Sequence, residues 1–294
     1  MNRRTCLWVV LACLAWSSCP SGAAVATLAD ANATVSVALD GPNAGMNGWT
    51  INGISQLAKQ WFSYRIGSTD PEASVDTLGG LFYGLSDTNY DGNSETLYVR
   101  YAGAMLKAEL TFTLTGSNPG NPRSDIGESI RLTNLTPQPM DLHFFQHCDL
   151  DLGGTVLDQS VRIVGGNTAQ QTDAGMYASE TVLMPLPSHL QVESVPDAVD
   201  MKGTVKWFND ALPTILNDSA GPLGPGDLSW AFQWDFPLGP AGSPSASVLI
   251  SKDKLIVPEP ATLSLLALGG AAILWRKRRA GQWQAKAVVR RSSE

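Results

Sequence analysis

The chain has 294 residues, with 27 acidic and 20 basic side chains, a net charge of -7 and an isoelectric point near 5.0. An acidic surface of this kind excludes binding to nucleic acid through the phosphates, which requires clustered lysines and arginines. Three of the four cysteines lie in the first 19 residues. Cys148 therefore has no disulfide partner in the rest of the chain, and we expect it to be buried as a small apolar side chain.

The N-terminus has the three parts of a secretory signal peptide. Arg3 and Arg4 form a positive start, residues 6–16 are apolar, and residues 21–26 are mostly small. The apolar run is too short to be a stable membrane span. The pattern therefore predicts export across the inner membrane.

The small residues place the predicted cleavage site at Ala24-x-Ala26, so residues 1–26 are assigned to the signal peptide. A lipoprotein signal that uses Cys19 stays open as the alternative, although Trp16 stands where a leucine is usual.

Alternating apolar residues predict that the exported part is all-β. In residues 106–114 every second side chain is apolar, which is typical of a half-buried strand. Clusters of glycine, proline, asparagine and aspartate separate similar short runs. We expect one all-β domain over residues 27–255, a β-sandwich or a larger two-sheet variant. The shorter runs are Val35/Val37/Leu39, Ile130/Leu132, Val161/Ile163 and Val248/Ile250.

The segment 87–95 is a candidate calcium loop. It has oxygen-bearing side chains at positions one, three and five and a glycine at position six. Position twelve is Tyr98 instead of the glutamate that an EF-hand requires, so the loop is not an EF-hand. The alternative is a polar hairpin turn. The predicted ligands are Asp87, Asn89, Asp91, Glu95 and the backbone carbonyl of Asn93.

A second polar segment, residues 141–151, has a His-x-x-x-His spacing. The apolar residues alternate with polar ones, which predicts a strand. At ~3.3 Å per residue, His143 and His147 would be about 13 Å apart, too far to share one zinc ion. We therefore predict a strand whose polar face is exposed to solvent. A second cation site remains an alternative for three of the acids: Asp149, Asp151 and Asp158.

No common catalytic motif is present in the sequence. It contains no Gly-x-Ser-x-Gly, His-Glu-x-x-His, Cys-x-x-Cys or phosphate-binding glycine loop. His189 lies among prolines and is expected on a loop. These observations predict that the chain is not an enzyme and has no catalytic residues. A pair of carboxylates of the glycosidase type stays open, because sequence alone cannot measure their separation.

Aromatic side chains are concentrated in residues 230–236. Trp230, Phe232, Trp234 and Phe236 fall on one face of a strand, which predicts a stripe in the core. If they were exposed instead, their rings could stack on sugars, as in carbohydrate-binding sandwiches.

The C-terminal part combines a proline-rich motif, an apolar run and a basic cluster. Val257-Pro258-Glu259-Pro260 precedes the apolar residues 261–275, and Arg276, Lys277, Arg278 and Arg279 follow. The prolines keep the motif extended, and the basic residues favour the cytoplasmic side of a membrane. This arrangement resembles the PEP-CTERM signal of exported bacterial proteins. An ordinary single-pass anchor is the alternative.

The resemblance implies that residues 256–280 are a sorting signal and that residues 281–294 form a cytoplasmic tail. It also implies recognition by an exosortase-type enzyme, a transient hold in the inner membrane, and delivery to the cell surface or extracellular matrix. Loose similarity to the β-sandwich ectodomains of PEP-CTERM proteins agrees with the predicted fold.

Without its two terminal segments the chain keeps 11 basic and 25 acidic residues, a net charge of -14. This charge suits solubility in a matrix and cation binding. We therefore expect a non-catalytic structural or adhesive ectodomain. The alternative is a carbohydrate-binding module or a glycan-active enzyme, with exopolysaccharide as a partner.

Overall fold

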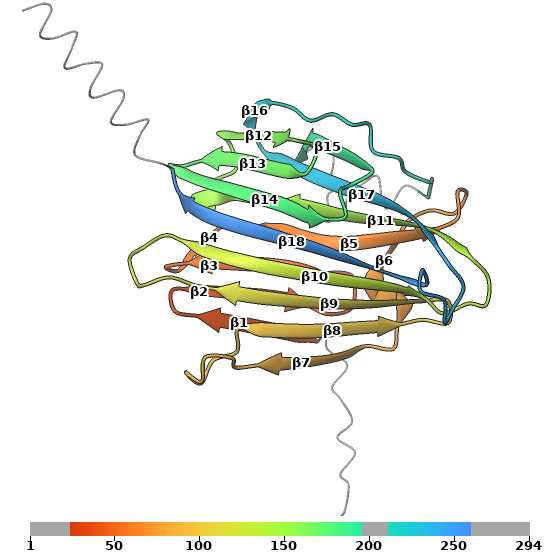
Figure 1. Ribbon diagram of the computed structural model, residues 1–294. Coiled ribbons are helices and arrows are strands. Elements are labelled where there is room, and N and C mark those ends of the chain that lie inside the picture. The colour runs from red at the N-terminus through yellow and green to blue at the C-terminus, as the bar shows by residue number, and fades with distance from the viewer. Residues whose placement is uncertain (1–23, 196–210, 260–294) are drawn as a thin grey trace, which may run out of the picture.

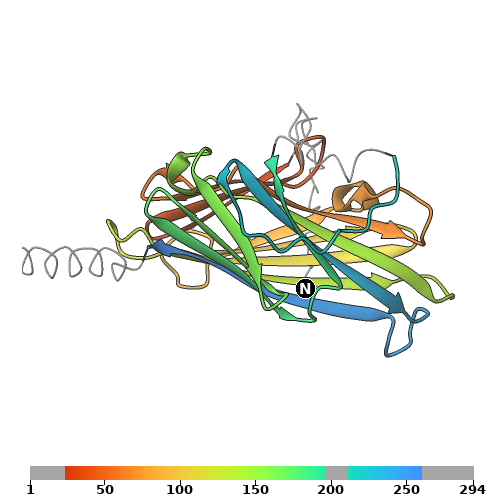
Figure 2. The same cartoon turned by 90° about the horizontal axis from the view of Figure 1, so that it is seen from above.

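The computed structural model describes residues 24–195 and 211–259. Their strands form two nine-stranded sheets, and every pair of neighbouring strands is antiparallel. Figures 1 and 2 show the two sheets as facing layers. The prediction of an all-β, two-sheet fold is confirmed.

Sheet A begins with the N-terminal strand and has the order β1-β2-β3-β5-β11-β17-β15, with β4 on β3 and β6 on β5. The bounds are β1 Val25–Asp30, β2 Ala33–Ala38, β3 Gly45–Ile51, β4 Ile54–Ser55, β5 Lys59–Ile66, β6 Ala73–Ser74, β11 Met140–Asp149, β15 His189–Ser194 and β17 Leu228–Leu238.

Sheet B has the order β16-β12-β13-β14-β18-β10-β9-β8-β7, so the last strand lies in its middle (Figure 1). Its bounds are β7 Phe82–Ser86, β8 Thr96–Ala102, β9 Leu106–Thr115, β10 Ser124–Asn134, β12 Gln159–Val164, β13 Thr168–Asp173, β14 Met176–Met184, β16 Leu223–Gly226 and β18 Ser247–Pro258. Two short 3-10 turns, η1 (Val75–Leu78) and η2 (Leu152–Gly154), lie in the connections.

The alternating run at 106–114 forms β9, with every second side chain buried. The other alternating runs fall on β2, β10, β12 and β18. The register pairs Ile130 of β10 with Leu110 of β9 on one side and with Ile250 of β18 on the other. Apolar residues from three strands therefore meet on the inner face, as period-two alternation requires.

The aromatic stripe of β17 lies between the sheets. Trp230, Phe232 and Trp234 are at most 1% exposed, and Phe236 is partly buried. The rings of Phe144 and Trp234 pack with their centroids 6.1 Å apart. The prediction of a core stripe is confirmed.

Cys148 is fully buried and forms no disulfide with any described residue. It lies on β11, and its side chain is part of the apolar core.

Four charged side chains whose burial was not predicted also lie in the core. Lys252 and Lys254 of β18 contact Glu128 of β10 and Glu180 of β14. The two lysines occupy inward positions between Ile250 and Ile256. That alternation is the sequence signal that would have predicted their burial.

Among the described residues, no helix is both long enough and apolar enough to span a membrane. Most of the predicted signal peptide and the apolar run 261–275 lie outside the described residues.

Candidate functional site

The predicted sorting motif starts inside the last strand of the sandwich. β18 pairs with β14, and the last two pairs are Tyr177 with Val257 and Met176 with Pro258. The backbone N–H of Glu259 donates a hydrogen bond of 2.9 Å to a carbonyl in the β13–β14 turn. The motif therefore continues directly from the folded sheet. The remaining predicted motif residues lie outside the described part of the chain: Pro260, Arg276, Lys277, Arg278 and Arg279.

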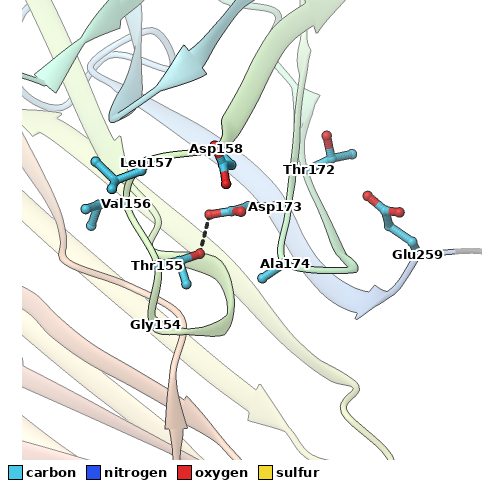
Figure 3. Close-up of a pocket in the computed structure, with 9 residues that line it drawn as sticks. All are labelled: Gly154, Thr155, Val156, Leu157, Asp158, Thr172, Asp173, Ala174 and Glu259. Atoms are coloured by element: carbon cyan, nitrogen blue, oxygen red, sulfur yellow. Dashed lines mark hydrogen bonds between the residues drawn. The ribbon is translucent and has the colours of Figure 1, made fainter.

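A pocket of about 550 Å³ lies beside Glu259 (Figure 3). Residues 154–158, from the last residue of η2 onward, form one wall, and residues 172–174, at the end of β13 and the start of the β13–β14 turn, form another. The Thr155 hydroxyl donates a 2.6 Å hydrogen bond to Asp173 and so ties the two walls together. Asp158, one of the acids in the predicted second cation set, lines this pocket.

The structure brings together a different set of three acids at the end of β11. Carboxylate oxygens of Asp149, Asp151 and Asp227 lie within 4.8 Å of one another. We call these three residues the carboxylate cluster. Asp149 and Asp151 belong to the predicted second cation set, but the third acid of the cluster is Asp227 instead of the predicted Asp158. Asp227 was missed because its proximity depends on the pairing of β11 with β17.

Burial and mutual repulsion shift the protonation of the carboxylate cluster. Burial, and then the charges of Asp151 and Asp227, raise the pKa of Asp149 to about 8. Burial and the charge of Asp227 raise the pKa of Asp151 to about 6. Burial also raises the pKa of Asp227. The environment therefore disfavours three negative charges that have no positive partner.

The predicted calcium loop connects β7 and β8, and its own backbone supplies many of its hydrogen bonds. Asp87 accepts hydrogen bonds from the N–H groups of Tyr90 and Gly92 at 2.6 and 2.9 Å. Asp91 accepts one from the N–H of Asn93 at 2.8 Å, and this bond holds the pKa of Asp91 below its ordinary value. These bonds give the loop the character of an Asx turn.

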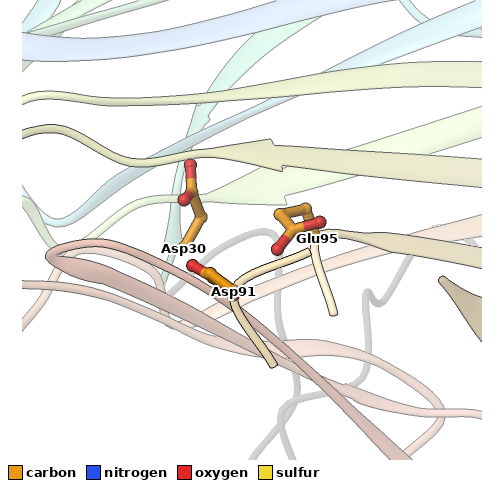
Figure 4. A group of neighbouring side chains, drawn as sticks. All are labelled: Asp30, Asp91 and Glu95. Carbon is orange, nitrogen blue, oxygen red and sulfur yellow. The ribbon is translucent and has the colours of Figure 1, made fainter. Parts of the chain in front are cut away.

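Two of the predicted ligands in this loop meet a third acid from β1. Oxygens of Asp30, Asp91 and Glu95 lie within 4.8 Å of one another (Figure 4). Glu95 is buried; its Oε2 accepts two bonds from Thr88, and its buried Oε1 has no partner. Asn89, another predicted ligand, donates a hydrogen bond of 3.2 Å from its side-chain amide to Asp91. It does not belong to the group formed by Asp30, Asp91 and Glu95. Asp30 was missed because β1 is about 60 residues away in the sequence.

The prediction that the polar face of residues 141–151 is exposed is wrong in part. The segment does form a strand, β11, but His147 and Asp149 are buried. Residues 211–220 cover part of this face: the N–H of Leu216, for example, donates to the side chain of Gln233 on β17. Burial, with a smaller effect of the Lys59 charge, lowers the pKa of His147 to about 3.

The other two histidines form a row with carboxylates on the outer face of sheet A. Nδ1 of His143 lies 2.6 Å from Asp235, and Nδ1 of His189 lies 3.0 Å from Asp218. Nε2 of His189 is 3.6 Å from the same Asp235. His189 is the first residue of β15 and not a loop residue, so that prediction is wrong.

Exposed Phe82 on β7 and half-buried Tyr98 on β8 lie at one edge of sheet B. Phe82 is 54% exposed, and its ring centroid is 6.3 Å from that of Tyr98. The guanidinium of Arg100 lies over the Phe82 ring at 5.1 Å. This surface was not predicted, because the sugar-stacking hypothesis rested on the aromatic residues 230–236.

The predicted signal cleavage site lies at the start of β1. Val25 pairs with Ala38 and Ala26 with Val37, and Ala26 is buried. Ala24 is anchored as well, because its backbone N–H donates to Asp40 at 2.7 Å. Cleavage after Ala26 would remove two residues from β1. The site stays a prediction that N-terminal sequencing of the exported protein would test.

Comparison with solved structures identifies similar folds. A bacterial glucoamylase complexed with acarbose has a TM-score of 0.51 at 9% identity, covering 86% of this chain and 36% of the glucoamylase chain. A putative aldose 1-epimerase from Escherichia coli K12 has a TM-score of 0.45 at 8% identity, covering 81% and 100%. A GalM/aldose epimerase homologue from C. elegans has a TM-score of 0.46 at 10% identity, with the same coverage.

The chain spans about a third of the length of the glucoamylase that it resembles, and 9% identity shows a shared fold alone. The comparison with curated proteins finds no match. The prediction that the chain is not an enzyme is contradicted, because a glucoamylase shares this fold. The sandwich is an enzyme-like fold, and its lack of common motifs does not make it a non-enzyme.

Residues 257–279 match the family described as the PEP-CTERM protein-sorting motif. This match confirms the assignment made from the proline motif, the apolar run and the basic cluster. It indicates export and sorting to the cell envelope or surface. The chain therefore carries a PEP-CTERM protein-sorting motif, which implies recognition by an exosortase-type sorting enzyme.

Proposed function

We propose that this protein is delivered to the cell surface or extracellular matrix after an exosortase-type enzyme acts at Pro258-Glu259-Pro260. The observation that carries this proposal is the position of the motif, which continues from β18 without a linker. The apolar run that follows holds the exported sandwich at the inner membrane until the motif is processed.

The end of β18 is suited to recognition. Pro258 is exposed, although it is still paired with Met176 of β14 as the last residue of β18. The enzyme therefore meets an extended peptide that emerges from the sheet, with the β13–β14 turn beside it. Proline at position 258 prevents this segment from starting a helix.

Replacing Pro258, Glu259 and Pro260 with alanine should trap the protein in the inner-membrane fraction. Immunoblots of membrane, surface and medium fractions measure the distribution. A variant with Pro240 and Pro244 replaced by alanine controls for the loss of prolines outside the motif. Unchanged delivery of the motif variant to the surface would refute the proposal.

A second candidate function is calcium binding at Asp30, Asp91 and Glu95. The buried, unpartnered Oε1 of Glu95 favours it, because an oxygen in that position lacks the hydrogen bond that burial requires. Asp87 then shapes the loop through its backbone bonds. Carboxylate oxygens are suitable ligands for a hard divalent cation.

Millimolar calcium should raise the melting temperature of the full chain in detergent, measured by differential scanning calorimetry. Glu95→Gln and Asp91→Asn should each reduce the rise, whereas Asp70→Asn, which changes an exposed acid elsewhere, should not. An equal rise in all variants would exclude this loop as the source.

Carbohydrate binding has a specific candidate surface in Phe82, Tyr98 and Arg100. Exposed aromatic faces can stack on sugar rings, whereas the buried Trp230 and Trp234 cannot. A glycan array that includes exopolysaccharide tests this proposal. Phe82→Ala should lose a signal that Phe112→Leu, a change in the core, retains.

A further inference from the structure

The carboxylate cluster of Asp149, Asp151 and Asp227 is held in place by two buried glutamines. Nε2 of Gln159 and Nε2 of Gln171 both donate to the carbonyl of Leu150, at 3.0 and 2.8 Å. Leu150 separates the first two acids of the cluster. Oε1 of Gln159 accepts the N–H of Leu228, the residue after the third acid, at 2.8 Å. One side chain therefore fixes both segments that carry the acids.

Two buried oxygens at this site lack partners. Oδ1 of Asp149 and Oγ of Ser229 form no hydrogen bond, and both residues are more than nine-tenths buried. The register places Asp149 directly opposite Ser229. Directly opposed side chains lie on the same face of the sheet with their Cβ atoms about 5 Å apart. The side chain of Ser229 therefore lies beside that of Asp149.

No described residue supplies a positive charge to the cluster. None of its carboxylates is in a salt bridge within the described part of the chain. Lys59 pairs in register with Asp149, but its side chain runs toward Gly45, where its Cε would lie 3.4 Å from an added Cβ. One buried carboxylate next to two half-buried ones, without a cation, is electrostatically costly.

We propose that Asp149, Asp151 and Asp227, together with the hydroxyl of Ser229, bind a calcium ion where β11 and β17 meet. All the donors are oxygens, which hard cations prefer over the nitrogen and sulfur ligands typical of zinc. Calcium–oxygen bonds are about 2.3–2.6 Å long, so two ligand oxygens of one ion can be up to about 5 Å apart. The carboxylate oxygens of the cluster lie within 4.8 Å of one another, so one ion can contact all three acids.

The bound ion would join three separate segments of the chain. Asp149 ends β11, Asp151 begins the loop that forms a wall of the pocket beside Glu259, and Asp227 precedes β17. Calcium would therefore stabilise that loop as well as the contact between the strands. This site is distinct from that of the β7–β8 loop, whose acids are contributed by the loop itself and by β1.

The test uses the full chain in detergent after removal of metal with EDTA. Calcium added at millimolar concentration should raise the melting temperature of the Asp91→Asn variant, in which the β7–β8 loop is disabled, by several degrees. Adding Asp149→Asn or Asp227→Asn to that variant should abolish the rise. Adding Asp158→Asn, an acid of the same loop outside the cluster, should leave it intact.

A second measurement separates binding from a merely structural role. Asparagine at position 149 has no carboxylate that could repel Asp151 and Asp227, so the melting temperature without calcium should stay the same or rise. Isothermal titration calorimetry should then show the loss of one calcium site per chain.

If both cluster variants keep the full calcium response and the same stoichiometry as the Asp91→Asn parent, the inference is overturned. Failure of the Glu95→Gln test bears only on the β7–β8 loop, so the two calcium proposals are tested independently.

Discussion

Nζ of Lys252 lies 2.8 Å from Oε2 of Glu128 although both side chains are only 1% exposed. The same ammonium is 2.9 Å from Glu180, and Lys254 completes a group with two positive and two negative charges. The Lys252 ammonium also lies 5.0 Å from the centroid of the Phe62 ring. This neutral group occupies the space between the two sheets.

Removal of one member of this group should be strongly destabilising. Lys252→Met leaves two glutamates next to one lysine, and an uncompensated buried charge costs about 3–5 kcal/mol. Chemical denaturation measures the free energy of unfolding. Lys107→Met is the matched control: it breaks the partly exposed 2.9 Å pair with Glu109, and its cost should be below about 1 kcal/mol. Equal costs for the two variants would contradict a special role for the buried group.

The buried group should also make the protein sensitive to acid. Burial alone would raise the pKa of Glu180, but Lys252 and Lys254 outweigh it and lower the pKa from 4.5 to about 2. The unfolded chain takes up the proton first, so this contribution to stability is complete above pH 4.5 and is lost as the pH falls toward 2. Glu180→Gln should unfold at a melting temperature that depends less on pH across this window, as calorimetry would show. An unchanged slope would rule out Glu180 as a source of the acid sensitivity.

The pair of Asp125 and Asp253 should have the opposite effect. Burial, and then the charge of Asp253, raise the pKa of Asp125 from 3.8 to about 6. The folded state holds this proton more tightly, so the contribution of this group to stability decreases as the pH rises from 3.8 to 6. Asp253→Asn removes the repulsion and should raise the melting temperature at pH 7 more than at pH 4. A larger gain at pH 4 would contradict this assignment.

Cys148 should be inert in the native protein. Burial raises the pKa of its thiol far above the ordinary value, and the side chain is closed off between the sheets. A thiol reagent should label Cys148 only after denaturation, detected by mass spectrometry of the labelled peptide. Cys148→Ala supplies the control for background labelling. Fast labelling of the native protein would show that the core opens at β11.

The sequence predicts those parts of the fold that depend on local alternation. The run at 106–114 forms a strand, and the stripe around Trp230 lies in the core. Contacts between distant strands were not predictable. Asp227 joins Asp149, and Asp30 joins Glu95, only because of how the strands are ordered in the sheets.

The burial of His147 shows a second limit of the sequence pattern. Alternation identifies two faces of a strand, but it does not show whether a distant segment such as 211–220 covers the polar face. The absence of common catalytic motifs likewise did not show whether the chain is an enzyme, because this chain and a glucoamylase share a fold although their sequences are only 9% identical.

The central position of β18 has a mechanical consequence. Tension applied through the C-terminal segment would enter the domain along this strand, which is hydrogen-bonded to β10 on one side and to β14 on the other. These bonds run perpendicular to the strand, so such a force loads both ladders in shear and must break many bonds together. An edge strand pulled from its end would resist through only one ladder. A pull on this end of the sandwich is therefore resisted by both ladders of β18.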